Sequence, residues 1–343
     1  MPALKRSIGV RVVADDEADK DAPSPGSRLR PLVTLSPHAG TGETRALPMI
    51  EIFGIPTQAL FGQLLLGLIN GSFYALLSLG LAIIFGMLDI INFTHGAQYM
   101  MGAFTAYLLL QHLGLGYWGA LVVAPILVGA TGILIERLLL RHLRQLDPLY
   151  GLLLTFGLAL IIEGVFRNHY GSAGEPYQVP EALQGGRNLG FMFLPNYRAW
   201  VIVFSITVCF TTWFVIERTR LGSYLRAATE NPTLVRAFGI NVPRMITLTY
   251  GFGVGLAALA GVMAAPIYNV SPQMGSDLII VVFAVVVIGG MGSIMGSIVT
   301  GFLLGIVEGL TKVFYPEASD TVIFVIMVIV LLVRPAGLFG RSA

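Results

Sequence analysis

Long uninterrupted runs of apolar residues dominate the pattern of hydrophobic and polar positions along the chain. No Asp, Glu, Lys or Arg occurs within residues 52–88, 90–135, 245–276 or 278–307. A helix needs about 20 mostly apolar residues to cross roughly 30 Å of hydrocarbon. Each run is long enough for at least one crossing, so the pattern indicates a membrane protein rather than a large soluble protein with buried helices.

The hydropathy pattern predicts up to nine membrane-spanning helices. Their approximate ranges are 60–87, 97–112, 117–136, 149–167, 199–216, 246–267, 277–290, 294–312 and 320–334. The number of crossings falls to eight or seven if 97–112 or 277–290 enters the membrane without crossing it. We therefore expect an all-α fold, a polytopic integral membrane helical bundle with about eight to nine transmembrane segments.

Short arginine-rich loops predict the orientation of the helices, because cytoplasmic loops carry an excess of Lys and Arg. Three arginines fall within residues 137–144 and five within 217–245, which predicts that both loops are cytoplasmic. Arg334 and Arg341 predict a cytoplasmic C-terminus. The longer loop 168–198 carries two arginines against two glutamates and is expected outside.

Composition agrees with this pattern and narrows the chemistry. Hydrophobic residues make up 55% of the 343 residues and charged residues 12%, with a mean hydropathy of +0.78, whereas soluble domains are about 25% charged. The one cysteine, Cys209, excludes an intrachain disulfide, and the five histidines are scattered. Because no phosphate-binding loop of the Walker type occurs, we expect that this chain does not hydrolyse ATP by itself. We also expect it to have no metal or other cofactor and no nucleic-acid partner, and not to be an enzyme.

The first fifty residues have a different character. Seven basic and six acidic residues are mixed there, and prolines, among them Pro23, Pro25, Pro31 and Pro37, interrupt any helical period. Such a segment buries too little apolar surface to offset its ordering entropy. We expect residues 1–50 to be a disordered tail, or to precede the true start at Met49, and residues 51–343 to form the transmembrane domain.

Small residues recur every fourth position in one predicted helix, at Ser293, Ser297, Gly301, Gly305 and Gly309. This spacing places them on one helix face, where small side chains allow neighbouring backbones to approach closely. The face is interpreted either as a subunit or pore-lining surface or as packing within the chain.

The segment 217–245 predicts two short helices in a cytoplasmic loop. An amphipathic stretch covers 221–230, Asn231-Pro232 suits the start of a second helix, and Gly239 suits its end. A solvated loop has no need of apolar residues in such positions. An exposed apolar face on a short helix is typical of a docking surface for another protein.

This segment resembles the coupling loop of ABC importer permeases, which contacts a groove on an ATPase subunit. The resemblance lies in Arg226-Ala-Ala-Thr-Glu-Asn-Pro and Ala237-Phe-Gly-Ile. It implies that coupling to the ATPase is carried by Arg226, Ala227, Ala228, Thr229, Glu230, Asn231, Phe238, Gly239 and Ile240.

Three further stretches resemble branched-chain amino-acid permeases of the high-affinity Liv type, whose relatives include urea and short-amide importers. They are Asn70-Gly-Ser-Phe-Tyr-Ala-Leu continuing through residues 86–96, then 283–296, and Arg334-Pro-Ala-Gly-Leu-Phe-Gly. The likeness covers about residues 58–340. It implies a type II ABC importer-like fold in a bacterial inner membrane.

The resemblance also implies partners and a mechanism. These are ABC ATPase subunits that bind the ATP, a second homologous permease subunit, a periplasmic solute-binding protein and the lipid bilayer. Branched-chain or other small amino acids would cross by alternating access, with urea or short amides as the alternative solutes. An ion-coupled secondary transporter would need a carboxylate at mid-membrane, and a membrane-embedded enzyme would need convergent titratable residues; neither pattern is evident.

Polar residues in the first half of the chain are candidates for the translocation path. These candidates are Asn70, Ser72, Tyr74, Asn92, Thr94 and His95. The segment 89–95 interrupts an apolar region, which is costly at membrane depth unless a cavity or partner faces it. Its polar residues are interpreted either as capping a helix break near the path or as forming a tight hydrogen-bonded turn. A metal-binding role for His95 is disfavoured, since no second ligand lies at suitable spacing.

A glycine-rich segment and three glutamates are the remaining polar or flexible features of the apolar region. Gly289-Gly-Met-Gly-Ser separates two apolar helices and is interpreted as a turn rather than a gate. Glu136 lies at the cytoplasmic edge and is expected to be ordinary, whereas Glu163 and Glu308 are expected to extend toward the external membrane boundary.

Overall fold

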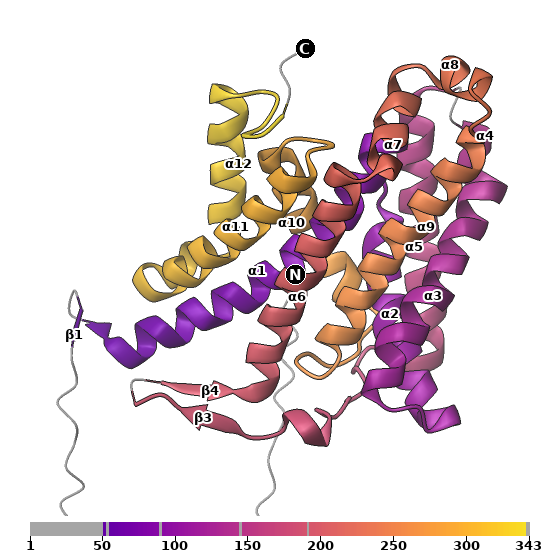
Figure 1. Ribbon diagram of the computed structural model, residues 1–343. Helices are drawn as coiled ribbons and strands as arrows, with labels where there is room; N and C mark the ends of the chain where they lie inside the picture. Colours follow the sequence, from indigo (N-terminus) through magenta and orange to yellow (C-terminus); the bar gives the residue numbers. More distant parts are fainter. Residues whose placement is uncertain (1–50, 53–54, 89–90, 144–145, 191, 341–343) are drawn as a thin grey trace, which may run out of the picture. The chain divides into compact units, whose positions relative to one another are not determined.

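The computed structural model describes residues 51–52, 55–88, 91–143, 146–190 and 192–340 (Figure 1). The expected tail 1–50 with Met49, and the loop residues Asp89, Arg144 and Arg341, lie outside the described residues.

Helices form almost all of the regular structure. The long helices are α1 (Thr57–Leu88), α2 (Thr94–Leu113), α3 (Tyr117–Ile135), α5 (Pro148–Tyr170), α6 (Asn196–Arg218), α9 (Val242–Ala264), α10 (Met274–Gly289), α11 (Ile294–Phe314) and α12 (Val322–Val333). The shorter helical elements are η1 (Glu136–Leu140, a π-helical turn), α4 (Arg141–Leu143), η2 (Glu181–Leu183), α7 (Arg220–Glu230), α8 (Pro232–Ala237) and η3 (Pro316–Ala318). The strands form two antiparallel pairs: β1 (Glu51–Ile52) with β2 (Ile55–Pro56), and β3 (Gly186–Asn188) with β4 (Phe193–Pro195).

Six of the described helical segments are long and apolar enough to cross a membrane. They begin at Thr57, Tyr117, Pro148, Asn196, Val242 and Ile294. Helices α10 and α12 are apolar but shorter, and the 16 residues of α10 span only about 24 Å at roughly 1.5 Å per residue. The predicted all-α, multi-pass membrane fold is confirmed, while the exact number of crossings stays a prediction.

Helices α1 and α9 form the centre of the bundle. In the most apolar 18-residue stretch of each helix, 83% of α1 and 72% of α9 is buried inside the protein, whereas only 11% of α5 is buried. Helix α1 packs against α11, α9 and α6, and α9 also packs against α2 and α3 (Figure 1). The large exposed apolar side chains of α5 suit a helix that faces lipid.

The row of small residues in α11 packs against α1. A Cβ atom added at Gly305 would lie 2.4 Å from the carbonyl oxygen of Gly67 and 2.4 Å from Cα of Gly71. One added at Gly309 would lie 2.5 Å from the carbonyl oxygen of Gln63. At Ser297 the backbone oxygen accepts a hydrogen bond from the Ser78 hydroxyl at 3.1 Å. Packing within the chain, one of the two interpretations of this face, is therefore what the structure shows.

Two glutamates are more buried than their sequence positions suggest. Glu136 has no exposed surface and accepts a 2.6 Å hydrogen bond from the Thr247 hydroxyl of α9, so it is not an ordinary edge residue. Glu308 is 6% exposed and does not extend outward, because Tyr74 and Lys312 hold its carboxylate inside the bundle. Both expectations were wrong because the hydropathy of a helix does not show whether its neighbours bury a carboxylate and donate hydrogen bonds to it.

The glycine-rich segment between α10 and α11 forms a tight turn. Gly290 has a φ of 101° and Gly292 a φ of 81°, a backbone region that other residues rarely adopt. The Ser293 hydroxyl accepts from the backbone N–H of Gly296 at 3.1 Å and caps α11. Leu338 donates its backbone N–H to Ile288 at 2.8 Å, so the segment after α12 lies against this turn.

Candidate functional site

The two short helices predicted between residues 221 and 240 are present as α7 and α8, and we call residues 220–240 the elbow. Asn231 begins α8 by accepting a 2.9 Å hydrogen bond at its side-chain oxygen from the backbone N–H of Leu234. Pro232 occupies the first turn, where its missing N–H costs little. Gly239, with a φ of 82°, ends the helix.

One face of the elbow is fixed to the membrane helices. Gly222 lies so close to α6 that an added Cβ atom would meet the carbonyl oxygen of Ile216 at 1.5 Å. Ala228 and Val235 are buried together with Val242 of α9. Ala228 was expected, with Ala227, on the surface that contacts the ATPase. It does not lie on an open docking face, because it packs against Val235 and Val242.

Several apolar side chains of the elbow are exposed. Phe238 at its tip is 77% exposed, and Leu234 is 54% exposed. Leu221 and Tyr224 of α7 are also exposed. Among the nine residues of the predicted coupling set, Phe238 therefore offers the largest accessible apolar surface.

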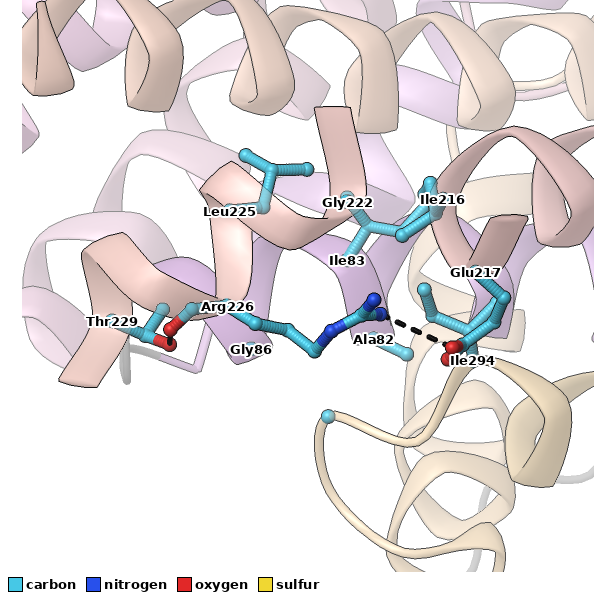
Figure 2. Close-up of a pocket in the computed structure, with 11 residues that line it drawn as sticks. Ala82, Ile83, Gly86, Ile216, Glu217, Gly222, Leu225, Arg226, Thr229 and Ile294 are labelled. Atoms are coloured by element: carbon cyan, nitrogen blue, oxygen red, sulfur yellow. Dashed lines mark hydrogen bonds and ion pairs between the residues drawn. The ribbon is translucent and has the colours of Figure 1, made fainter. Parts of the chain in front are cut away.

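A small pocket of ≈ 100 Å³ separates α7 from the ends of three membrane helices (Figure 2). Its walls include Gly86 of α1, Glu217 of α6 and Gly292 of the turn before α11. Arg226 of α7 donates to the Glu217 carboxylate at 3.1 Å across this pocket. Both side chains are more than 40% exposed, so the pair positions α7 more than it stabilises the fold.

A second, larger cavity of ≈ 260 Å³ is partly open to the surroundings, and we call it the polar cavity after the polar side chains in its wall. Asn70, Phe73 and Tyr74 of α1 line it, with Tyr99 of α2. The rest of its wall comes from the loop after α9 and from α10, through Tyr268, Asn269, Ser271, Met274, Asp277 and Leu278.

The polar cavity lies well away from the elbow. Tyr74 in its wall precedes Gly86 beside the elbow by twelve residues of α1, which is about 18 Å along the helix at roughly 1.5 Å per residue. The two sites are therefore linked along α1 rather than in contact.

A hydrogen-bonded network supports one wall of the polar cavity. Glu308 accepts from the Tyr74 hydroxyl at 2.7 Å and from the Asn70 amide at 3.2 Å. The Tyr268 hydroxyl donates to the Asn70 side-chain oxygen at 2.9 Å. Lys312 pairs with the same carboxylate, which offsets the cost of burying its charge.

The structure separates the predicted translocation-path residues into three places. Asn70 and Tyr74 line the polar cavity. Ser72 is buried, and its backbone oxygen accepts from the Ser205 hydroxyl of α6 at 3.2 Å.

Asn92, Thr94 and His95 form a compact turn at the start of α2. Asn92 accepts at its side-chain oxygen from the backbone N–H of Thr94 at 3.2 Å and donates to the Tyr250 hydroxyl at 3.0 Å. The His95 Nε2 atom lies 3.0 Å from the carbonyl oxygen of Leu77. The hydrogen-bonded turn is present, and a part in the translocation path stays a prediction for these three residues.

Four residues at or beside the polar cavity were not singled out as path residues: Tyr99, Tyr268, Asp277 and Glu308. For Glu308 a signal existed, since it is a lone carboxylate in an apolar helix with Lys312 one turn later. The tyrosines gave none, because nothing local distinguishes a cavity-lining tyrosine from a packed one. The described residues contain no group of three or more His, Cys, Asp and Glu side chains that could hold a metal ion.

The described residues thus form a multi-pass bundle of apolar membrane helices with a cavity between them and a separate elbow. The chain belongs to the family described as "Branched-chain amino acid transport system / permease component", which matches residues 63–331. This is a family of transport permease subunits and not of enzymes.

Individual relatives agree with this assignment. The chain is 30% identical over 302 residues to the high-affinity branched-chain amino acid transport system permease protein LivH of Escherichia coli K12, covering 81% of this chain and 95% of LivH. It is 32% identical over 294 residues to the corresponding protein BraD of Pseudomonas aeruginosa, with the same coverage of 81% and 95%. It is 29% identical over 295 residues to LivM of Escherichia coli, covering 78% of this chain and 68% of LivM. No solved structure matches the chain.

Proposed function

We propose that the chain is the membrane-spanning permease subunit of an ATP-driven ABC importer for branched-chain or other small amino acids. The observation that carries this proposal is the family match over residues 63–331, which includes the whole elbow and the whole polar cavity. The printed names of LivH and BraD, as branched-chain amino acid permeases, support the solute class.

Other subunits would supply the energy and the solute. Two ABC ATPase subunits bind the ATP, and a periplasmic binding protein delivers the amino acid. Similarity to both LivH and LivM, each a permease protein of a high-affinity system, supports a second homologous permease as partner. The chain itself needs no cofactor in this proposal.

The elbow is proposed to pass ATPase motion to the membrane helices. Its exposed apolar side chains, with Phe238 at the tip, enter a groove on the ATPase. Its buried face is joined to α6 through Gly222 and to α9 through Val242. Because α7 also borders the ends of α1 and α11, closure of the ATPases would move helices that form the polar cavity (Figure 2).

The arginine-rich loops support an orientation with the elbow and the C-terminus in the cytoplasm of a bacterium, and the β3–β4 hairpin outside its inner membrane. Residues 1–50 are proposed as a disordered tail and 51–343 as the transmembrane domain.

Solute competition tests the proposed substrate class. In cells that carry the complete system, uptake of labelled leucine should depend on this chain and should fall when excess isoleucine or valine is added. Excess urea or acetamide should leave it unchanged. If uptake of labelled urea or acetamide requires this chain while leucine uptake does not, the permease serves the alternative solutes.

A further inference from the structure

Several polar side chains in the wall of the polar cavity have no hydrogen-bond partner among the described residues. The Tyr99 side chain is 1% exposed and lines the cavity, and no described residue forms a hydrogen bond with its hydroxyl. Asp277, Asn269 and Ser271 also line the cavity without a side-chain hydrogen bond to a described residue. Asn269 and Asp277 are exposed at the rim of the cavity, whereas Tyr99 is buried. Because a buried polar group is normally hydrogen-bonded, the Tyr99 hydroxyl indicates a place for a polar atom from outside the chain.

The same cavity also has apolar side chains in its wall. Phe73, Met274 and Leu278 contribute apolar surface to its wall. Its volume of ≈ 260 Å³ is close to the lower end of small-molecule sites, which begin at roughly 300 Å³. The cavity wall thus contains both polar and apolar side chains, at the scale of one small molecule.

The charges near the cavity specify the polar end of that molecule. Asp277 lies in the first turn of α10 and lines the cavity. Its carboxylate attracts a cationic group. Glu308 is already neutralised by Lys312 and bonded to Tyr74, so Asp277 is the cavity-lining carboxylate left for a ligand.

We propose that the polar cavity binds one zwitterionic α-amino acid with an aliphatic side chain, held by Asp277 and the Tyr99 hydroxyl. The ammonium group contacts Asp277, the Tyr99 hydroxyl bonds the carboxylate, and the side chain lies against Phe73, Met274 and Leu278. This assignment rests on the proposed function for the solute class. Glu308 is a positioning residue, because it fixes Tyr74 and Asn70 in the wall without lining the cavity.

Thermal unfolding of the purified full-length chain in detergent tests the site without any partner subunit. A ligand that binds only the folded state raises the unfolding temperature, so millimolar leucine should raise that of the parent. Asp277→Asn and Tyr99→Phe should reduce leucine affinity by about tenfold or more, since each removes one hydrogen bond of the kind made with a charged group. Both variants keep the shape of the side chain and break no bond within the fold.

Matched controls and comparison ligands make the result decisive. Glu317→Gln and Tyr315→Phe, both outside the cavity, should keep the full leucine response. N-acetyl-leucine, which lacks the ammonium group, and acetamide should not stabilise the parent. Equal leucine responses in the parent and both cavity variants, a response to acetamide in place of leucine, or no leucine response in the parent would each overturn the assignment. If the assembled system with the parent chain shows no ATP-driven uptake of leucine, the proposed function is refuted, but the binding result in detergent is unaffected.

Discussion

Gly305→Leu is expected to prevent the chain from reaching a stable fold. Gly305 faces α1 at a point where an added Cβ atom already lies 2.4 Å from backbone atoms of Gly67 and Gly71. Backbone atoms cannot rotate away as side chains do, so α1 and α11 would have to separate. Overpacking of a well-packed core lowers the free energy of unfolding by about 1–3 kcal/mol or more. We expect the loss for Gly305→Leu to lie at or above the upper end of that range.

The measurement is the unfolding temperature and folded yield of the purified variant in detergent. Gly164→Leu is the matched control, because Gly164 lies in the mostly exposed helix α5 and an added Cβ atom meets nothing within 4 Å. The control should be as stable as the parent. Equal stability of Gly305→Leu and the parent would mean that α1 and α11 do not pack as closely as described.

Phe238→Glu is expected to abolish coupling between the permease and its ATPase while leaving the chain folded. Phe238 is 77% exposed and contributes little to the fold, so its replacement should not change the unfolding temperature. In the proposed docking, its ring is the central apolar anchor, and loss of such an anchor costs about 2 kcal/mol or more, or roughly 30-fold in affinity. A charge placed in an apolar groove adds a desolvation cost.

ATP hydrolysis by the assembled transporter, stimulated by loaded binding protein, is the readout for Phe238→Glu. Phe238→Leu keeps an apolar side chain and should retain most of the stimulation. Ala228→Glu should instead lower the unfolding temperature, because Ala228 is buried between the elbow and α9. Normal stimulation in Phe238→Glu would show that the elbow does not couple the two subunits.

Much of the fold follows from local sequence. The apolar runs predict the membrane helices, and the elbow follows from Asn231, Pro232 and Gly239, since capping and helix-ending preferences depend on neighbouring residues alone. The small residues around Gly305 predict a close helix contact, but not its partner. Only the three-dimensional structure shows that α1, more than two hundred residues earlier, meets this face.

The polar cavity could not be derived in the same way. Asn70 and Tyr74 were expected near the path from family motifs, but Tyr99 and Asp277 lie on other helices and reach the cavity only through tertiary packing. Burial also depends on facing helices, as Glu136 shows through its bond to Thr247 on α9. Ala228 was misplaced for the same reason, because helical periodicity shows an apolar face without showing whether α9 or another protein covers it.

Leucine accumulation in proteoliposomes tests the central claim most directly. The full-length chain is reconstituted with its second permease and ATPase subunits, with ATP enclosed on the elbow side and loaded binding protein on the other. The account predicts that leucine accumulates when ATP is present and no ion gradient is imposed, and that it stops when ATP is omitted. Accumulation that requires an imposed proton or sodium gradient and proceeds without ATP would contradict the account and identify a secondary transporter.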